Sequence, residues 1–219
     1  MLILNKIWAH VRRSSQVVTR FVERELFAEA PSLRRANRKV TQQIEQALRD
    51  YSKVAEQLRP IAEGLTLDDV RRYVASEAER RKSLEDKAKA NLVAITIGFT
   101  VLFASINFFA KKESNTPIRG LWAAALFIFL MIGVCYLLYG GLKAIDSLQL
   151  RSVYNPSPED DSGLRETMRK IKLLWCLEQN ERTTLLRANA IDVSYRAIRN
   201  GVFTLAACIV ILAVRLITL

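Results

Sequence analysis

Three apolar runs of helical length constrain this chain more than any other feature of its sequence. Residues 91–110 (NLVAITIGFTVLFASINFFA) and 120–142 (GLWAAALFIFLMIGVCYLLYGGL) carry no charge, and residues 202–219 carry one, Arg215. A bilayer core of roughly 30 Å is crossed by about 20 helical residues. Soluble helices of this length keep a polar face, which these runs lack. We therefore predict three transmembrane helices.

The remaining segments show helical periodicity and no strand-like alternation. The expected fold is all-α: an integral membrane protein with three transmembrane helices and a helical cytoplasmic domain formed by long stalk helices. Residues 1–27 have an apolar and a basic face, which suits an amphipathic helix in the headgroup region or a helix packed in an oligomer. The predicted domains are 1–90 (cytoplasmic sensor and oligomerisation region), 91–142 (transmembrane hairpin), 143–201 (cytoplasmic helical segment) and 202–219 (third transmembrane helix).

A long helix is predicted to lead into the first apolar run. Thr66 followed by Asp69 matches a capping box, in which a hydroxyl and an acid three residues later satisfy free amide groups at a helix start. Helical character then continues to Ala110, which gives a helix of roughly 45 residues, about 65 Å long. Such a stalk would transmit movement to the bilayer, or would serve as a simple extended anchor.

A second long helix, from residues 163–164 to about Asn200, is predicted to lead into the third run. We expect the two stalks to pack in an antiparallel or coaxial bundle, with Asn180 and Asn189 forming hydrogen bonds between helices. Earlier in the chain, one helix ended by Pro60 and Gly64 is expected to carry a single apolar stripe. The stripe residues are Val40, Ile44, Ala47, Tyr51, Val54 and Leu58.

The chain is basic, with 33 Lys and Arg against 22 Asp and Glu and a formal net charge of +11. Since basic residues near the spans are more numerous in the two large polar segments, we place 1–90 and 143–201 in the cytoplasm and the 111–119 loop outside. Both anionic membrane lipid and a nucleotide or oligonucleotide fit the basic clusters. Sequence-specific DNA recognition is not expected, because among these clusters only Tyr73 offers a ring for base stacking. The candidate residues are Arg34, Arg35, Arg38, Lys39, Arg71, Arg72, Arg80, Arg81 and Lys82.

Reactive side chains are scarce. One His, three Cys and eight Gly leave little material for a metal site, a disulfide framework or a phosphate-binding loop. The sequence has no P-loop, no GxSxG and no HExxH motif. We therefore expect no enzyme, no catalytic residue, no metal and no cofactor.

Polar residues in the first run form a row. Thr96, Thr100 and Asn107 fall on one helix face, and Phe103 or Ala104 completes the row. These residues could form hydrogen bonds within or between helices, or they could line a water-filled path in an oligomer, with Phe99 or Phe103 as a constriction. Arg215, near the outer end of the third run, could reach the headgroups or face the same path. Close approach to the second run is permitted by Gly133, Gly140 and Gly141.

Two stretches resemble known membrane effectors. Residues 80–106 (RRKSLEDKAKANLVAITIGFTVLFASI) resemble the entry to the first span of SLATT-like membrane proteins. Residues 180–212 (NERTTLLRANAIDVSYRAIRNGVFTLAACIVIL) resemble the helix-into-span segment of related bacterial anti-phage effectors, among them the Hailong-type effector and effectors of some retron and cyclic-nucleotide systems. SLATT proteins usually have two spans, whereas this chain has three apolar runs.

The resemblance implies a homo-oligomeric effector of the bacterial inner membrane that acts in abortive infection. It would disrupt the membrane potential under control of a nucleotide or oligonucleotide made by a partner enzyme. We therefore predict a gated pore or channel, multi-pass, with a cytoplasmic N-terminus. The alternative is a non-conducting membrane scaffold that recruits a cytoplasmic partner through its amphipathic helices.

Overall fold

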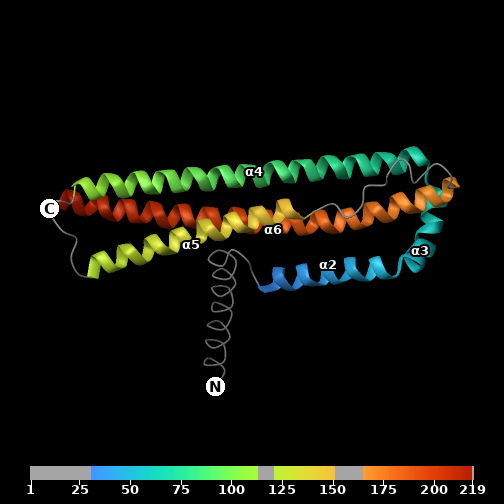
Figure 1. Cartoon of the computed structure of the whole chain (residues 1–219), viewed down its shortest axis with the longest axis horizontal. Helices are drawn as coiled ribbons and strands as arrows, with labels where there is room; N and C mark the ends of the chain where they lie inside the picture. The colour runs from blue at the N-terminus through green and yellow to red at the C-terminus, as the bar shows by residue number, and fades with distance from the viewer. Residues whose placement is uncertain (1–30, 113–120, 151–164, 219) are drawn as a thin grey trace, which may run out of the picture. The chain divides into compact units, whose positions relative to one another are not determined.

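The structure, a computed structural model, describes residues 31–112, 121–150 and 165–218. These residues form the helices α2 (Pro31–Arg49), α3 (Tyr51–Gly64), α4 (Leu67–Lys112), α5 (Leu121–Gln149) and α6 (Glu166–Thr218), and no strand (Figure 1). The all-α prediction is confirmed for this part of the chain. The amphipathic helix predicted within 1–27 and most of the 111–119 loop lie outside the described residues.

The helix α4 begins where the sequence predicts it. The Thr66 hydroxyl lies 2.6 Å from Oδ2 of Asp69 and accepts a hydrogen bond from the Asp69 backbone N–H at 3.2 Å. The Asp69 carboxylate in turn accepts from the Thr66 N–H, which completes the capping box. These hydrogen bonds from Thr66 hold the pKa of Asp69 below its usual value.

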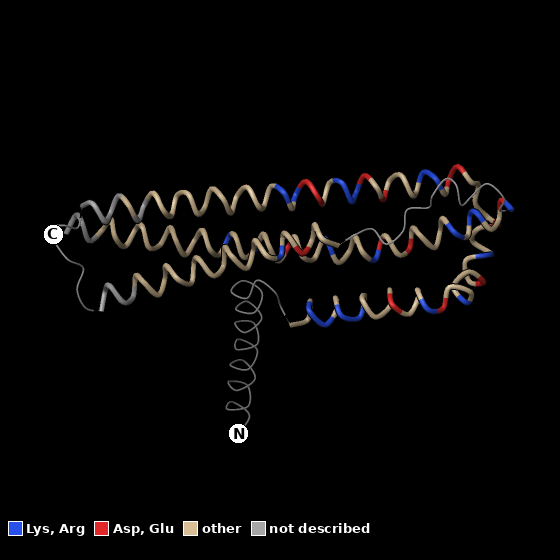
Figure 2. The backbone as a smooth tube through the Cα atoms, viewed as in Figure 1, with Lys and Arg blue, Asp and Glu red and all other residues tan. Residues whose placement is uncertain are grey.

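Both long helices run without a break. α4 has 46 residues and α6 has 53, which corresponds to lengths of about 69 and 80 Å. In each of them the charged residues lie in the N-terminal part, and the C-terminal part is nearly free of charge (Figure 2). The continuous stalks predicted from the sequence are therefore confirmed, including the stretch between Lys82 and Asn91.

The helices α4, α5 and α6 are each long and apolar enough to cross a membrane. Only 17% to 22% of their apolar windows is buried within the chain. Large apolar side chains on them face outward and are 52% to 66% exposed, among them Val101, Phe127, Leu138, Phe203 and Val210. Apolar surface on this scale marks a contact with lipid or with other protein. These helices indicate a multi-pass membrane protein.

The single helix predicted through residues 40–58 is wrong, because the chain bends at Asp50. This residue has φ −109° and ψ 39° and separates α2 from α3. Asp is a weak helix former, since its side chain competes for backbone hydrogen bonds. The Tyr51 ring, just after the bend, meets the Trp175 ring edge-on, with centroids 5.0 Å apart. This aromatic contact between distant residues favours the bend.

α3 ends at Gly64, as predicted, whereas Pro60 lies inside the helix and does not end it. Proline removes one helical N–H donor, yet α3 continues to Gly64. Ala62, in the last turn, is fully buried in the core, and this burial helps to hold the last turn in place. The core cluster here contains Ala62, Val70, Ile171, Leu173 and Leu174, with Ala55, Leu58, Leu65 and Leu67 packed against it. Leu58, the last residue of the predicted stripe, therefore packs against the chain's own core.

The chain divides into two compact units. The polar unit contains residues 34–92 and 143–192, and the apolar unit contains 93–142 and 193–219 with the chain up to Leu33. In the polar unit, Lys170 Nζ donates to the Leu65 carbonyl at 2.9 Å, and Asn91 Nδ2 donates to the Ile191 carbonyl at 3.4 Å. From the first pair to the second, the residue number increases along both α4 and α6, so the two helices run parallel. The predicted antiparallel or coaxial bundle is wrong, because both helices start at the same end of this unit.

In the apolar unit, α5 packs closely on α6 at glycines. A Cβ placed on Gly133 would lie 2.8 Å from Leu205, and one on Gly201 would lie 3.0 Å from a leucine of α5. A Cβ on Gly140 would lie 3.1 Å from a backbone oxygen of α6. The close approach predicted for Gly133 and Gly140 is confirmed, whereas Gly141 has its nearest contact at an ordinary 3.6 Å.

Candidate functional site

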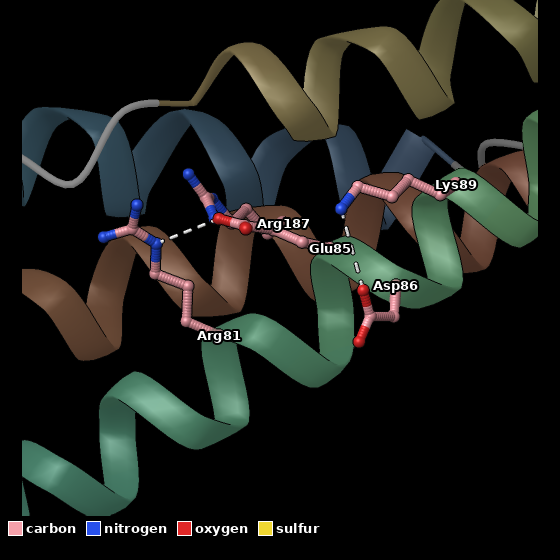
Figure 3. A network of polar contacts seen from close by, with 5 residues as sticks. All are labelled: Arg81, Glu85, Asp86, Lys89 and Arg187. Atoms are coloured by element: carbon pink, nitrogen blue, oxygen red, sulfur yellow. Dashed lines mark hydrogen bonds and ion pairs between the residues drawn. The ribbon is translucent and has the colours of Figure 1, made fainter.

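The polar unit contains a buried ion pair that joins the two long helices (Figure 3). Nη1 of Arg187, on α6, donates to Oε1 of Glu85, on α4, at 2.7 Å. Nε of Arg81, one turn before Glu85, donates to the same oxygen at 3.1 Å. Only 2% of the Arg187 side chain is exposed, against 32% for Glu85 and 33% for Arg81. One carboxylate therefore serves a fully buried guanidinium and a partly buried one.

Arg187 depends on this carboxylate. A guanidinium stays charged in proteins, and a buried charge without a partner is costly. The hydrogen bond from Arg187 lowers the pKa of Glu85, and the one from Arg81 adds to the effect, although partial burial opposes it. Glu85 is therefore ionised at neutral pH. The neighbouring pair of Asp86 and Lys89, 3.7 Å apart, differs in that both side chains are more than 60% exposed, so it contributes little to stability.

Two turns before the ion pair, α4 and α6 bury further polar groups. Glu77 is 8% exposed, and its Oε2 pairs with Arg80, but Oε1 has no partner within the described chain. Gln179 is fully buried, and neither atom of its side-chain amide has a partner there. Each lies eight residues before its member of the ion pair, Glu85 or Arg187, so the parallel register places them at one level. Such groups make this interface less stable than an apolar one.

The predicted anion-binding residues lie in two separate places. On α2, Arg34, Arg35, Arg38 and Lys39 are exposed, and on α4, Arg71, Arg72, Arg80 and Lys82 are exposed. Asn37 of α2 accepts a hydrogen bond from Asn189 at 2.7 Å, whereas Leu65, just before α4, contacts Lys170. Arg182 contacts the Gln43 carbonyl of α2, and Arg187 pairs with Glu85 of α4. The nearest ends of the two clusters, Lys39 and Lys82, therefore lie on different helices beside the same part of α6.

Part of the α4 cluster already pairs with carboxylates on its own helix. Arg71 lies 3.5 Å from Asp68, and Arg80 lies 3.5 Å from Glu77. Arg81, predicted as an anion ligand, is engaged by Glu85. An anionic ligand on α4 would therefore compete with these carboxylates for the guanidinium groups.

The predicted row on α4 lies on the surface of the apolar unit. Thr96, Thr100, Phe103 and Asn107 are all exposed. The Thr100 hydroxyl donates to the Thr96 carbonyl at 2.9 Å, a bond within the helix. Phe103 stacks on Phe99 with ring centroids 6.4 Å apart. The row is thus left uncovered by α5 and α6, where lipid or a second subunit would meet it. The side chain of Arg215 lies outside the described residues.

Sequence patterns leave Glu85 and Arg187 unassigned, although a signal for Arg187 exists. Gln179, Thr183, Arg187, Ala190 and Ser194 form a stripe on α6 that is buried or half-buried throughout. Arg187 carries the charge in this otherwise uncharged stripe, and a buried charge requires a counter-charge on a neighbouring helix. The stripe alone does not identify the partner, because the choice among carboxylates depends on the register of α4.

Among the described residues, no group of three His, Cys, Asp or Glu side chains could hold a metal ion. Cys135, Cys176 and Cys208 are free thiols. The chain matches no protein-family model, no curated protein and no solved structure, and its resemblance to SLATT-like proteins stays a prediction.

Proposed function

We propose that this chain is the subunit of a homo-oligomeric gated pore in the bacterial inner membrane, an anti-phage effector that disrupts the membrane potential in response to a nucleotide-type signal. One observation carries the proposal. α4 and α6 each continue without a break from the polar unit into a stretch apolar enough to cross a membrane. Because a helix is a rigid element, a displacement of its charged part moves its apolar part as well.

The interface between α4 and α6 in the polar unit supports a gating role. A gate needs an interface that takes a second arrangement at modest cost. Here a single carboxylate, Glu85, holds Arg187 and Arg81, next to the buried polar side chains of Glu77 and Gln179. Phosphate groups bind guanidinium strongly and bidentately. A phosphorylated signal would therefore compete with Glu85 for Arg81, and it would change the charge around the pair of Glu85 with Arg187 that joins α4 to α6.

The uncovered row on α4 supports a conduction path between subunits. Its polar members, Thr96, Thr100 and Asn107, are exposed on the apolar part of α4, where the other outward residues are apolar. In an oligomer built with this face inward, the row lines the path and Phe103 narrows it. The polar segments lie in the cytoplasm in this arrangement, where a nucleotide signal is produced.

Membrane potential in a bacterial host that makes the chain tests the proposal. Glu85→Gln weakens the charge pairing and should conduct without signal, so cells depolarise in a potential-sensitive dye assay. Adding Thr100→Phe should block the path and reduce depolarisation at least tenfold. Val101→Phe is the matched control, because Val101 is 52% exposed on the same helix but lies outside the row.

An unchanged potential in cells containing abundant, inserted Glu85→Gln protein would overturn the proposal. If Val101→Phe reduces depolarisation as much as Thr100→Phe does, the row does not line the conduction path. Capture of a stoichiometric cytoplasmic partner by such a silent protein, lost on Ile44→Asp, would instead support the scaffold alternative. Ile44 is suited to this test because it is only half-buried on α2.

A further inference from the structure

The four basic residues of α2 are exposed and lie on one side of the helix. Successive helical residues are about 100° apart, so these four fall within one sector of about 140°. The opposite side of α2 carries the buried or half-buried residues Leu33, Asn37, Val40, Ile44 and Ala47. Asn37 pairs with Asn189, and the Gln43 carbonyl accepts from Arg182 at 3.3 Å, which fixes this orientation on α6. The basic residues, which define the α2 quartet, are Arg34, Arg35, Arg38 and Lys39.

The start of α2 lies against the apolar helices. Leu33, together with Tyr136 and Tyr139 of α5, packs on Val193 and Ala197 of α6. Tyrosines are enriched where transmembrane helices meet the membrane surface, since the ring sits among apolar groups and the hydroxyl among headgroups. The apolar unit therefore places Leu33 beside an aromatic pair typical of the membrane boundary.

Two further helices change from charged to uncharged at the same short stretch of α6. On α4 the uncharged run starts at Asn91, which donates to the Ile191 carbonyl. On α5 it ends just before Lys143, one turn after Gly140, which approaches the Ser194 carbonyl. Leu33 packs against the same stretch of α6, residues 191–197. The start of α2 thus lies at the level where α4 and α5 would leave the hydrocarbon.

The quartet is close enough to this level to act on headgroups. Arg34 and Arg35 follow Leu33 directly, and Lys39 lies six residues beyond it, about 9 Å along the helix. Charges act on one another over about 8–10 Å at physiological ionic strength. Arg80 of the α4 cluster lies eleven residues before Asn91, about 17 Å away, and is largely screened.

We propose that the α2 quartet is a docking site for anionic phospholipid headgroups, which anchors the N-terminal end of α2 at the membrane surface. Each Lys or Arg near an anionic leaflet strengthens its attraction by about fivefold. The inference does not depend on conduction, and lipid retention tests it separately from the proposed pore.

Retention of phosphatidylglycerol by the full chain provides the test. The protein is equilibrated with equimolar phosphatidylglycerol and phosphatidylcholine in mixed micelles, and bound lipid is counted by native mass spectrometry. The variant replaces the α2 quartet with Gln. The matched control replaces Arg71, Arg72, Arg80 and Lys82 with Gln, which removes the same charge from exposed positions of α4. Circular dichroism confirms equal helicity.

We expect the wild-type chain to retain phosphatidylglycerol at least tenfold over phosphatidylcholine. The quartet variant should lose this preference at least tenfold, and the control should stay within twofold of wild type. Equal losses in both variants, or no loss in the quartet variant, would overturn the proposal. A single-stranded oligonucleotide at matched phosphate concentration is added in a second arm. If the quartet variant loses only oligonucleotide binding, the quartet binds a soluble polyanion and the lipid assignment is wrong.

Discussion

Removal of the Glu85 carboxylate tests the ion pair between α4 and α6. Glu85→Ala leaves Arg187, with 2% of its side chain exposed, without the oxygen that now lies 2.7 Å away. Removing one partner of a buried pair costs about 3–5 kcal/mol. Because Glu85 itself is 32% exposed, water screens part of the interaction. We therefore expect the low end of that range, about 3 kcal/mol, which corresponds to a fall in Tm of about 6–12 °C for a chain of this size.

The apparent Tm of the full chain, measured by tryptophan fluorescence in nanodiscs of one composition, checks this value. Asp86→Ala is the matched control, because it removes the same charge at the adjacent position, where the partner Lys89 is 66% exposed. Its effect should stay within about 0.5 kcal/mol. Glu85→Leu combined with Arg187→Met should recover most of the loss, since apolar groups often replace a buried pair at little cost. Equal Tm values for Glu85→Ala and Asp86→Ala would show that the ion pair of Glu85 with Arg187 does not stabilise the chain.

Three further predictions follow from the geometry. Gly201→Leu should destabilise the apolar unit by about 1–3 kcal/mol, because the new Cβ would lie 3.0 Å from a leucine of α5. Gly64→Ala is the control and should leave the Tm unchanged, because nothing lies within 4 Å of the new Cβ. Because the folded pKa of Glu85 is lowered, the stabilisation by its carboxylate is complete above the ordinary pKa of 4.5 and is lost as the pH falls through the folded pKa. The difference in Tm between wild type and Glu85→Gln should therefore be constant near neutral pH and should shrink below pH 4.5. A membrane-impermeant maleimide should leave buried Cys176 unlabelled until denaturation, while Cys135, exposed on the apolar part of α5, should react in the folded protein only with a lipid-soluble maleimide.

The elements that short stretches of chain encode could be predicted from the sequence. Three apolar runs predicted three helices of membrane-spanning length, and Thr66 with Asp69 predicted the start of α4 within a residue. The absence of any breaker before Lys112 predicted that the stalk runs unbroken into the apolar part. These features depend on hydrophobicity, periodicity and capping, which act between residues a few positions apart. The role of the row on α4 stays a prediction, because it concerns contacts outside a single chain.

Three features depend on contacts between distant parts of the chain: the bend at Asp50, the parallel register of α4 and α6, and the partner of Arg187. The bend depends on a ring that reaches Tyr51 from α6, far along the chain. Arg187 and Glu85 lie 102 residues apart in sequence, and Glu85 alone reads as one more exposed charge on a helix. Their pairing follows from how two long helices align, which is set by the summed packing of many residues and by no local pattern.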